Sequence, residues 1–404
     1  MEGDRICERC GQVIPRGTEE CPNCAHPQRL RLRRDTFLLV CLLLLGILFA
    51  ITGFAVKLYH NREKALGGHW YTKGEQSLQH GNPEGAMLDF RTALFHAPDN
   101  PVYQLRLAQA LVHSNRLVEA RSYLLRLWET NPADGQVNLE LARVAMRQGN
   151  VPQVITCYHN AIDGVWPTPS EGQRRKLREE LCEYLISQNR RTEALAELMA
   201  LSAETPNNAR LRTQVADLFL NAQDYDIALN QFRRSLRLNR RQPKAWQGAG
   251  EAAFQMGDYR AARDYLSRAH SEEPRNKDVA ARLSTADRVL EMDPFDRRVP
   301  AAERRRRVVA DFELALARIE SCAKSRGETL QVPTPQTDLE KAYASALKMK
   351  PKVRDRTLRL HPDLADVIMN FIFQVEQMTA QDCGAPQGAD LALLLIASKS
   401  GGED

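Results

Sequence analysis

The stretch PKAWQGAGEAAFQMGDYRAARDYLSRAHSEEP, residues 243–274, decides the fold of this 404-residue chain. Small residues stand at its eighth, twentieth and twenty-seventh positions, as Gly250, Ala262 and Ala269, where they let two paired helices approach closely. Pro274 stops the second helix, because proline cannot continue one. The stretch therefore predicts a pair of antiparallel helices joined by a short turn.

The same pattern recurs along the chain with a period of 34 residues, interrupted once by a six-residue slip after Trp166. A period of this length is typical of stacked helical units, each of which buries its apolar face only against its neighbours. We therefore expect six units over residues 67–276, at 67–100, 101–134, 135–168, 175–208, 209–242 and 243–276.

These units resemble tetratricopeptide repeats, and the resemblance covers about half of the chain. It implies an all-α superhelical solenoid in which the first helices of successive repeats line a concave groove that binds other proteins or peptides. It also implies which positions face that groove: Tyr71, Leu105, Gln109, Leu139, Arg143, Glu179, Glu183, Asp217 and Glu251. The middle of this set is apolar and the later repeats are more acidic, so we expect repeats two and three to bind the partner.

An apolar segment lies ahead of the repeats. No charged residue occurs between Thr36 and Val56, and about 20 residues of helix span a bilayer. A secretory signal would have a shorter apolar core and a cleavage site, so we expect a retained transmembrane helix over residues 36–58. The basic juxtamembrane segment 29–35, with four arginines from Arg29 to Arg34, is expected to contact anionic lipid.

The first 28 residues carry two C-x2-C pairs, Cys7 with Cys10 and Cys21 with Cys24. Each short pair can turn both sulfurs toward one tetrahedral ion, and four thiolates close its coordination shell, which predicts a structural zinc site. The segment resembles the small zinc ribbons at the front of many bacterial membrane proteins, although Ala25 stands where such knuckles usually carry glycine. Two disulfides and an iron site are the alternatives.

Charge does not indicate nucleic acid as a partner. The net charge is only +5, and through Asp35 seven arginines oppose six acidic residues, to which a zinc–thiolate core would add negative charge. A zinc ribbon that senses nucleic acid therefore stays a minor alternative.

Two arguments predict the membrane orientation. The four arginines before the span outnumber Lys57, Arg62 and Lys64 after it, and positive flanks stay in the cytoplasm. A thiolate cluster is also safer in a reducing compartment. We therefore expect a single-pass protein of the bacterial inner membrane, with a cytoplasmic amino terminus and periplasmic repeats.

Residues 277–292 are expected to cap the solenoid, and residues 301–404 to form a small helical bundle. Within the bundle, the loop that begins at Cys383 is interpreted as a structural turn, with a reactive thiol as the alternative. We found no phosphate-binding loop, zinc-protease motif or nucleophile elbow. The sequence thus predicts a membrane-anchored scaffold or adaptor of the cell envelope that is not an enzyme. The alternative is an envelope enzyme, or an accessory subunit, with an unrecognised site after Ala301.

Overall fold

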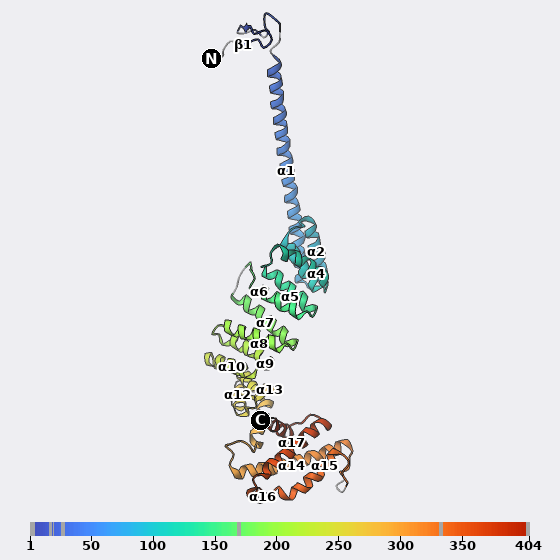
Figure 1. Ribbon diagram of the computed structural model, residues 1–404, viewed down its shortest axis with the longest axis vertical. Coiled ribbons are helices and arrows are strands. Elements are labelled where there is room, and N and C mark those ends of the chain that lie inside the picture. The colour runs from blue at the N-terminus through green and yellow to red at the C-terminus, as the bar shows by residue number, and fades with distance from the viewer. Residues whose placement is uncertain are drawn as a thin grey trace. The chain divides into compact units, whose positions relative to one another are not determined.

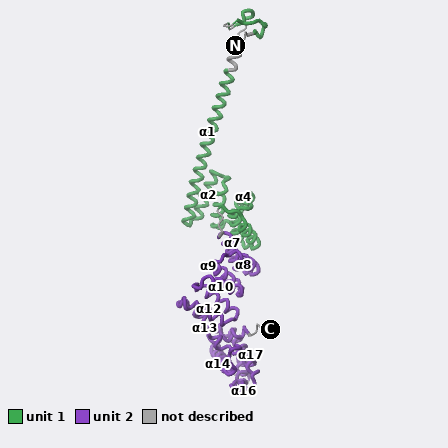
Figure 2. The backbone as a smooth tube through the Cα atoms, turned by 90° about the vertical axis from the view of Figure 1, so that its left-hand side faces the viewer, with its two compact units in different colours: residues 1–167 green, residues 168–404 purple. Residues whose placement is uncertain are grey.

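The computed structural model describes residues 5–15, 18, 20–25, 29–167, 171–330 and 334–400. They form two compact units, Met1–Pro167 and Thr168–Asp404 (Figure 2), which we describe separately. Apart from one two-stranded ribbon, the secondary structure of the described residues is helical, which confirms the prediction of an all-α repeat fold. The boundary between the units coincides with the slip in the repeat pattern after Trp166.

Unit 1 begins with strands β1 (Arg5–Ile6) and β2 (Val13–Ile14), which pair antiparallel. Helix α1 (Arg29–Gln79) follows and runs without a break from the apolar segment into the first repeat (Figure 1). The sequence analysis treated the membrane segment and the first repeat helix as separate elements. The structure joins them because no proline or turn interrupts the helical residues between them.

The remaining helices of unit 1 pack in antiparallel pairs on the end of α1. Gly74 of α1 is required for this packing, because a Cβ atom there would lie 2.5 Å from the ring of Phe90. Asn82, Asn100 and Asp134 cap helix starts by accepting hydrogen bonds from backbone amides. The helices are α2 (Pro83–His96), α3 (Pro101–His113), α4 (Leu117–Thr130), α5 (Gly135–Arg147) and α6 (Val151–Ile162).

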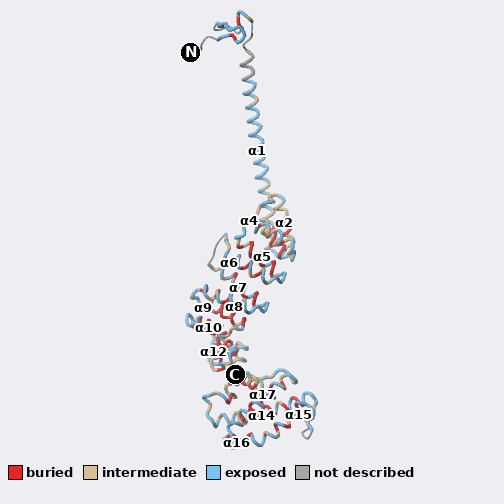
Figure 3. The backbone as a smooth tube through the Cα atoms, viewed as in Figure 1, coloured by how far each residue is buried: buried red, intermediate tan, exposed pale blue. Residues whose placement is uncertain are grey.

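Unit 2 continues the paired helices and ends in a bundle. Its core is formed by aromatic and small residues such as Phe219, Phe232 and Ala249, all fully buried (Figure 3). The paired helices are α7 (Glu171–Ser187), α8 (Arg191–Glu204), α9 (Ala209–Asn221), α10 (Tyr225–Leu238), α11 (Pro243–Gln255) and α12 (Tyr259–Glu272), followed by the single helix α13 (Lys277–Met292).

The turn inside each helix pair has one residue in the left-handed conformation. These residues are Gly81, Asn115, Gly149, Asn189, Gln223 and Gly257, with φ between +55° and +75°. Their spacing is 34 residues, except for 40 between Gly149 and Asn189, so the backbone repeats the period and the slip that the sequence shows. Glycine and asparagine tolerate this conformation well, whereas glutamine adopts it at a cost.

The bundle packs around α14 and α17. A capping box between Thr337 and Glu340 starts α15, and α18 contacts both α17 and the last helix of the repeat array, α13. The bundle helices are α14 (Ala301–Arg326), α15 (Asp338–Met349), a 3-10 turn (Lys350–Lys352), α16 (Asp355–Leu360), α17 (Leu364–Asp382) and α18 (Ala389–Ser400).

Candidate functional site

The four amino-terminal cysteines lie together beside the ribbon. Their Sγ atoms all lie within 4.8 Å of one another, with 3.5 Å between Cys7 and Cys24 and 3.5 Å between Cys10 and Cys21. Each pair sits in a tight knuckle, which in the second pair is closed by the hydrogen bond from the Ala25 amide to the Cys21 carbonyl (2.8 Å). Ala25 has φ +46°, so it takes the left-handed conformation in which glycine is usual.

This donor set fits one tetrahedral metal ion. With a Zn–S bond of about 2.3 Å, tetrahedral sulfurs lie about 3.8 Å apart, which is within the range of the observed separations. The backbone amides of Arg9 and Cys10 donate to the Cys7 sulfur and lower the pKa of that thiol to about 6. The cluster therefore favours the thiolate form that metal ligands require.

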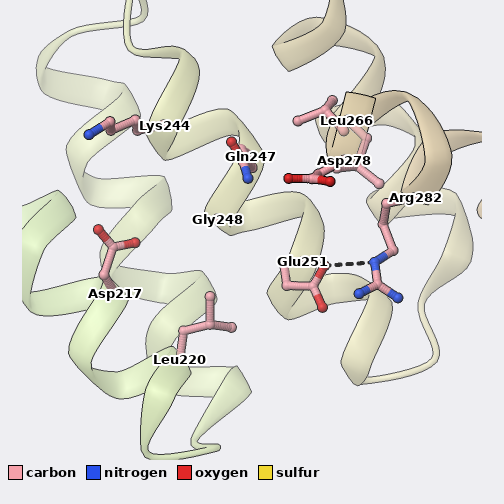
Figure 4. Close-up of a pocket in the computed structure, with 10 residues that line it drawn as sticks. Asp217, Leu220, Lys244, Gln247, Gly248, Glu251, Leu266, Asp278 and Arg282 are labelled. Carbon is pink, nitrogen blue, oxygen red and sulfur yellow. Dashed lines mark ion pairs between the residues drawn. The ribbon is translucent and has the colours of Figure 1, made fainter. Parts of the chain in front are cut away.

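A cavity of about 450 Å³ lies between α9, α11 and α13 in unit 2 (Figure 4). Helices α9 and α11 are the first helices of their pairs, so the cavity lies on the surface that the repeat pattern predicts to bind. Gly248 lines it, and a Cβ atom there would lie 2.2 Å from the Phe232 ring. The sequence analysis favoured repeats two and three, whereas this cavity lies in repeats five and six.

Carboxylates outnumber cations around the cavity. Arg282 pairs with Glu251 (Nε to Oε2, 2.9 Å), and its guanidinium lies 4.6 Å from the centre of the Phe254 ring, so these two charges compensate each other. Burial raises the pKa of Asp217 to about 6, which the charge of Lys244 only partly offsets. Asp217 is thus a carboxylate without sufficient positive charge beside it.

The predicted groove positions of unit 2 differ in their exposure. Asp217 and Glu251 line the cavity. Glu183 is exposed, whereas Glu179 is half-buried, lies 3.7 Å from Arg175 and has a pKa raised by burial.

The predicted groove positions of unit 1 are mostly engaged within the protein. Tyr71 stacks on Tyr103 with ring centres 5.0 Å apart, and Leu105 is half-buried. The side chains of Gln109 and Arg143 bind the same carboxylate, that of Glu140, at 2.9 Å and 2.7 Å. Leu139 is only 7% exposed, so it packs into the core of unit 1 rather than facing an open groove.

Two segments of the chain, residues 77–138 and 214–277, match family models described as tetratricopeptide repeat. The chain carries tetratricopeptide repeats. The second matched segment contains both Asp217 and Glu251 of the cavity. No match was found among curated proteins.

The fold also has relatives among solved structures. YrrB, a TPR protein with an unusual peptide-binding site, is 17% identical with a TM-score of 0.36, over 47% of this chain and 95% of that chain. PilF of Pseudomonas aeruginosa is 15% identical with a TM-score of 0.37, over 54% and 96%. PilW, a type IV pilus biogenesis factor, is 15% identical with a TM-score of 0.37, over 53% and 96%. We base no functional conclusion on likenesses at this level.

Outside the tetratricopeptide repeats, Cys322 of α14 and Cys383 at the end of α17 form a disulfide, with their Cα atoms 5.6 Å apart. The interpretation of Cys383 as only part of a turn missed this bond. A signal was present, because these two are the only cysteines after residue 300 and fall in one small bundle. Cys182, in contrast, is a buried free thiol whose pKa burial raises to about 12.

Two buried acids in the bundle were also missed. Asp311 is 2% exposed and Glu376 is fully buried, and neither Oδ2 of Asp311 nor either Glu376 oxygen has a hydrogen-bond partner among the described residues. Burial raises both pKa values to about 8; Asp390 raises that of Glu376 further, whereas Arg318 lowers it. Helical periodicity could have revealed Asp311, because it lies between Val308 and Phe312 on the apolar face of α14.

Glu376 makes the stability of the bundle dependent on pH. Its pKa is raised from 4.5 to about 8 on folding, so the folded state keeps a proton that the unfolded state releases. Stability is therefore expected to fall as the pH rises from about 4.5 to 8. Glu376→Gln mimics the protonated form and should be more stable than the parent at pH 8.5 by about 2 kcal/mol.

Pulse proteolysis of the detergent-solubilised full chain in urea, at pH 6 and pH 8.5, measures this effect. Glu183→Gln, at an exposed position of α7, is the control and should leave the pH dependence unchanged. If Glu376→Gln loses as much stability between the two pH values as the parent does, Glu376 is not the group responsible.

Proposed function

We propose that this protein is a scaffold of the bacterial cell envelope, anchored by one transmembrane helix, which binds other proteins through its tetratricopeptide repeats and catalyses no reaction. Helix α1 is long and apolar enough to cross a membrane, and its most apolar window is entirely exposed (Figure 3). Such a continuous apolar surface is unfavourable in water, which supports a bilayer as its environment. The side chains of Arg29 to Arg34 lie outside the described residues, and their contact with anionic lipid remains part of this proposal.

The observation that carries the orientation is the different state of the cysteines before and after α1. Before it, Cys7, Cys10, Cys21 and Cys24 are free thiols placed for one metal ion, which we propose to be zinc. After it, Cys322 and Cys383 are joined in a disulfide. Disulfides persist in oxidising compartments and thiolate clusters in reducing ones, which supports a cytoplasmic ribbon and periplasmic repeats.

The cavity between α9, α11 and α13 supports binding of a protein segment in the groove. A partner that places a lysine or arginine beside Asp217 would supply the missing positive charge and return the pKa of Asp217 toward its ordinary value. Gln247 and Leu220 at the same cavity offer an amide and an apolar contact. We therefore propose an extended segment with a basic side chain as the ligand of this part of the groove.

Photocrosslinking in cells tests this groove. We expect a photoreactive phenylalanine at Lys244, an exposed position at the cavity, to give protein adducts. The same residue at Arg237, exposed on the second helix α10, is the matched control and should give few. Adding Asp217→Lys should lower the Lys244 adduct yield about tenfold, which corresponds to about 1.4 kcal/mol. Equal yields at Lys244 and Arg237, both insensitive to Asp217→Lys, would contradict binding in this groove.

A further inference from the structure

Helix α1 fixes how far the first repeat lies from the membrane. The charge-free segment ends at Val56, and α1 continues as a helix to Gln79. At a rise of about 1.5 Å per residue, Glu63 lies about 10 Å beyond Val56 along the helix axis. The headgroup layer begins where the hydrocarbon core ends and is about 5–8 Å thick, so Glu63 lies near its outer edge.

The carboxyl-terminal end of α2 lies at the same level. Nδ1 of His96 lies 2.6 Å from the Glu63 carboxylate, and a Cβ atom at Gly67 would lie 3.6 Å from Cβ of His96. Further from the span, Gly74 of α1 faces Phe90 of α2, so the two helices run antiparallel. Helix α2 therefore points its last turn back toward the membrane.

That last turn exposes an aromatic side chain. Phe95 is 80% exposed, although the other phenylalanine of α2, Phe90, is fully buried. Single exposed apolar residues are common on proteins, but aromatic residues are enriched at the level of lipid headgroups. Tyr59 of α1, 62% exposed, lies four residues before Glu63 and extends the aromatic character toward the span.

The charges at this level fit an anionic surface. Lys57, Arg62 and Lys64 of α1 are exposed, whereas the one acidic residue among them, Glu63, is paired with His96. Basic side chains near a membrane surface are attracted to anionic lipids by about 1 kcal/mol each. Exposed aromatic and basic side chains together are typical of a segment that contacts headgroups.

We propose that the first repeat docks on the membrane surface, with Phe95 inserted among anionic lipid headgroups beside α1. This inference rests on the proposed function, because it requires α1 to cross a bilayer. Since α1 is also the first helix of the first repeat, docking at Phe95 would hold α2 at a fixed angle to the membrane. Unit 1 would then be oriented by two contacts, the span and Phe95, rather than by the span alone.

Photocrosslinking to phospholipid tests the inference on the full chain in cells whose lipids carry ³²P. A photoreactive phenylalanine replaces Phe95, Leu88 or Phe49 in turn, and the label bound to the purified protein is counted. Leu88 is the matched control, because it is 61% exposed and lies two turns further from the span on the same helix. Phe49, 74% exposed in the apolar segment, reports on the anchor itself.

We expect strong labelling from position 49, labelling from position 95 at least fivefold above that from position 88, and a further decrease at position 95 when Arg62 and Lys64 are both replaced by glutamine. Labelling at 49, with 95 no higher than 88, would overturn the docking and leave the anchor intact. A protein adduct at 95 in place of lipid would also overturn it. Absence of label at all three positions would contradict the anchor, and the docking with it.

Discussion

Replacement of Cys7 by serine is expected to reduce the zinc content of the protein from one ion per chain to none and to unfold the ribbon. The core of the ribbon consists of Cys7, Ile14 and Cys21, with Cys24 packed against it, which is too small to fold on apolar burial alone. Binding of a structural zinc ion contributes roughly 10–16 kcal/mol in such small domains, so the metal supplies most of the folding free energy. Elemental analysis of the purified full chain gives the metal content, and hydrogen exchange of residues 5–25 reports the folding.

Cys41→Ser is the control for this experiment. Cys41 lies in the apolar segment of α1, away from the cluster, and its replacement should leave one zinc ion per chain. Retention of zinc by Cys7→Ser would contradict the four-thiolate site. Iron in place of zinc in the unaltered protein would favour the iron site that the sequence left open.

Replacement of Cys322 by serine is expected to lower the free energy of unfolding of the bundle by about 4 kcal/mol. The disulfide joins residues 61 positions apart, and closing a loop of that length removes a corresponding entropy from the unfolded chain. It also links α14 to the end of α17, the two helices at the centre of the bundle. Pulse proteolysis of the detergent-solubilised chain in urea measures the change.

The parent protein treated with dithiothreitol should unfold at the same urea concentration as Cys322→Ser. Cys157→Ser, which replaces a buried free thiol in unit 1, should leave the bundle unchanged. A parent protein whose bundle is insensitive to dithiothreitol would show that Cys322 and Cys383 are not joined in solution.

The repeat fold could be predicted because each unit depends on a few small residues at fixed spacing. Gly74 and Gly250 each lie within 3 Å of where a neighbouring side chain would meet an added Cβ atom, so larger residues are excluded there. The turn residues repeat the same period in φ, from Gly81 to Gly257. The four metal-binding cysteines were equally accessible to sequence reasoning, because their spacing is local.

The features that the sequence did not reveal depend on contacts between distant residues. The pairing of Cys322 with Cys383 follows from the packing of α14 against α17, which no local pattern specifies. The burial of Glu376 arises in the same way, because charged residues on an amphipathic helix are normally assigned to its exposed face. The cavity at Asp217 depends on the spacing of three helices, and position within a repeat predicts only the face on which it lies.

The orientation of the chain across the membrane is the central claim, and paired reporter fusions after Asp404 test it most directly. Alkaline phosphatase is active only in the periplasm, and green fluorescent protein exported as an unfolded chain is dark there. We predict an active phosphatase fusion and a dark fluorescent fusion, in agreement with a disulfide-bonded carboxyl-terminal region and a thiolate ribbon on opposite sides of α1. An inactive phosphatase together with a fluorescent fusion would place the repeats in the cytoplasm and contradict the account.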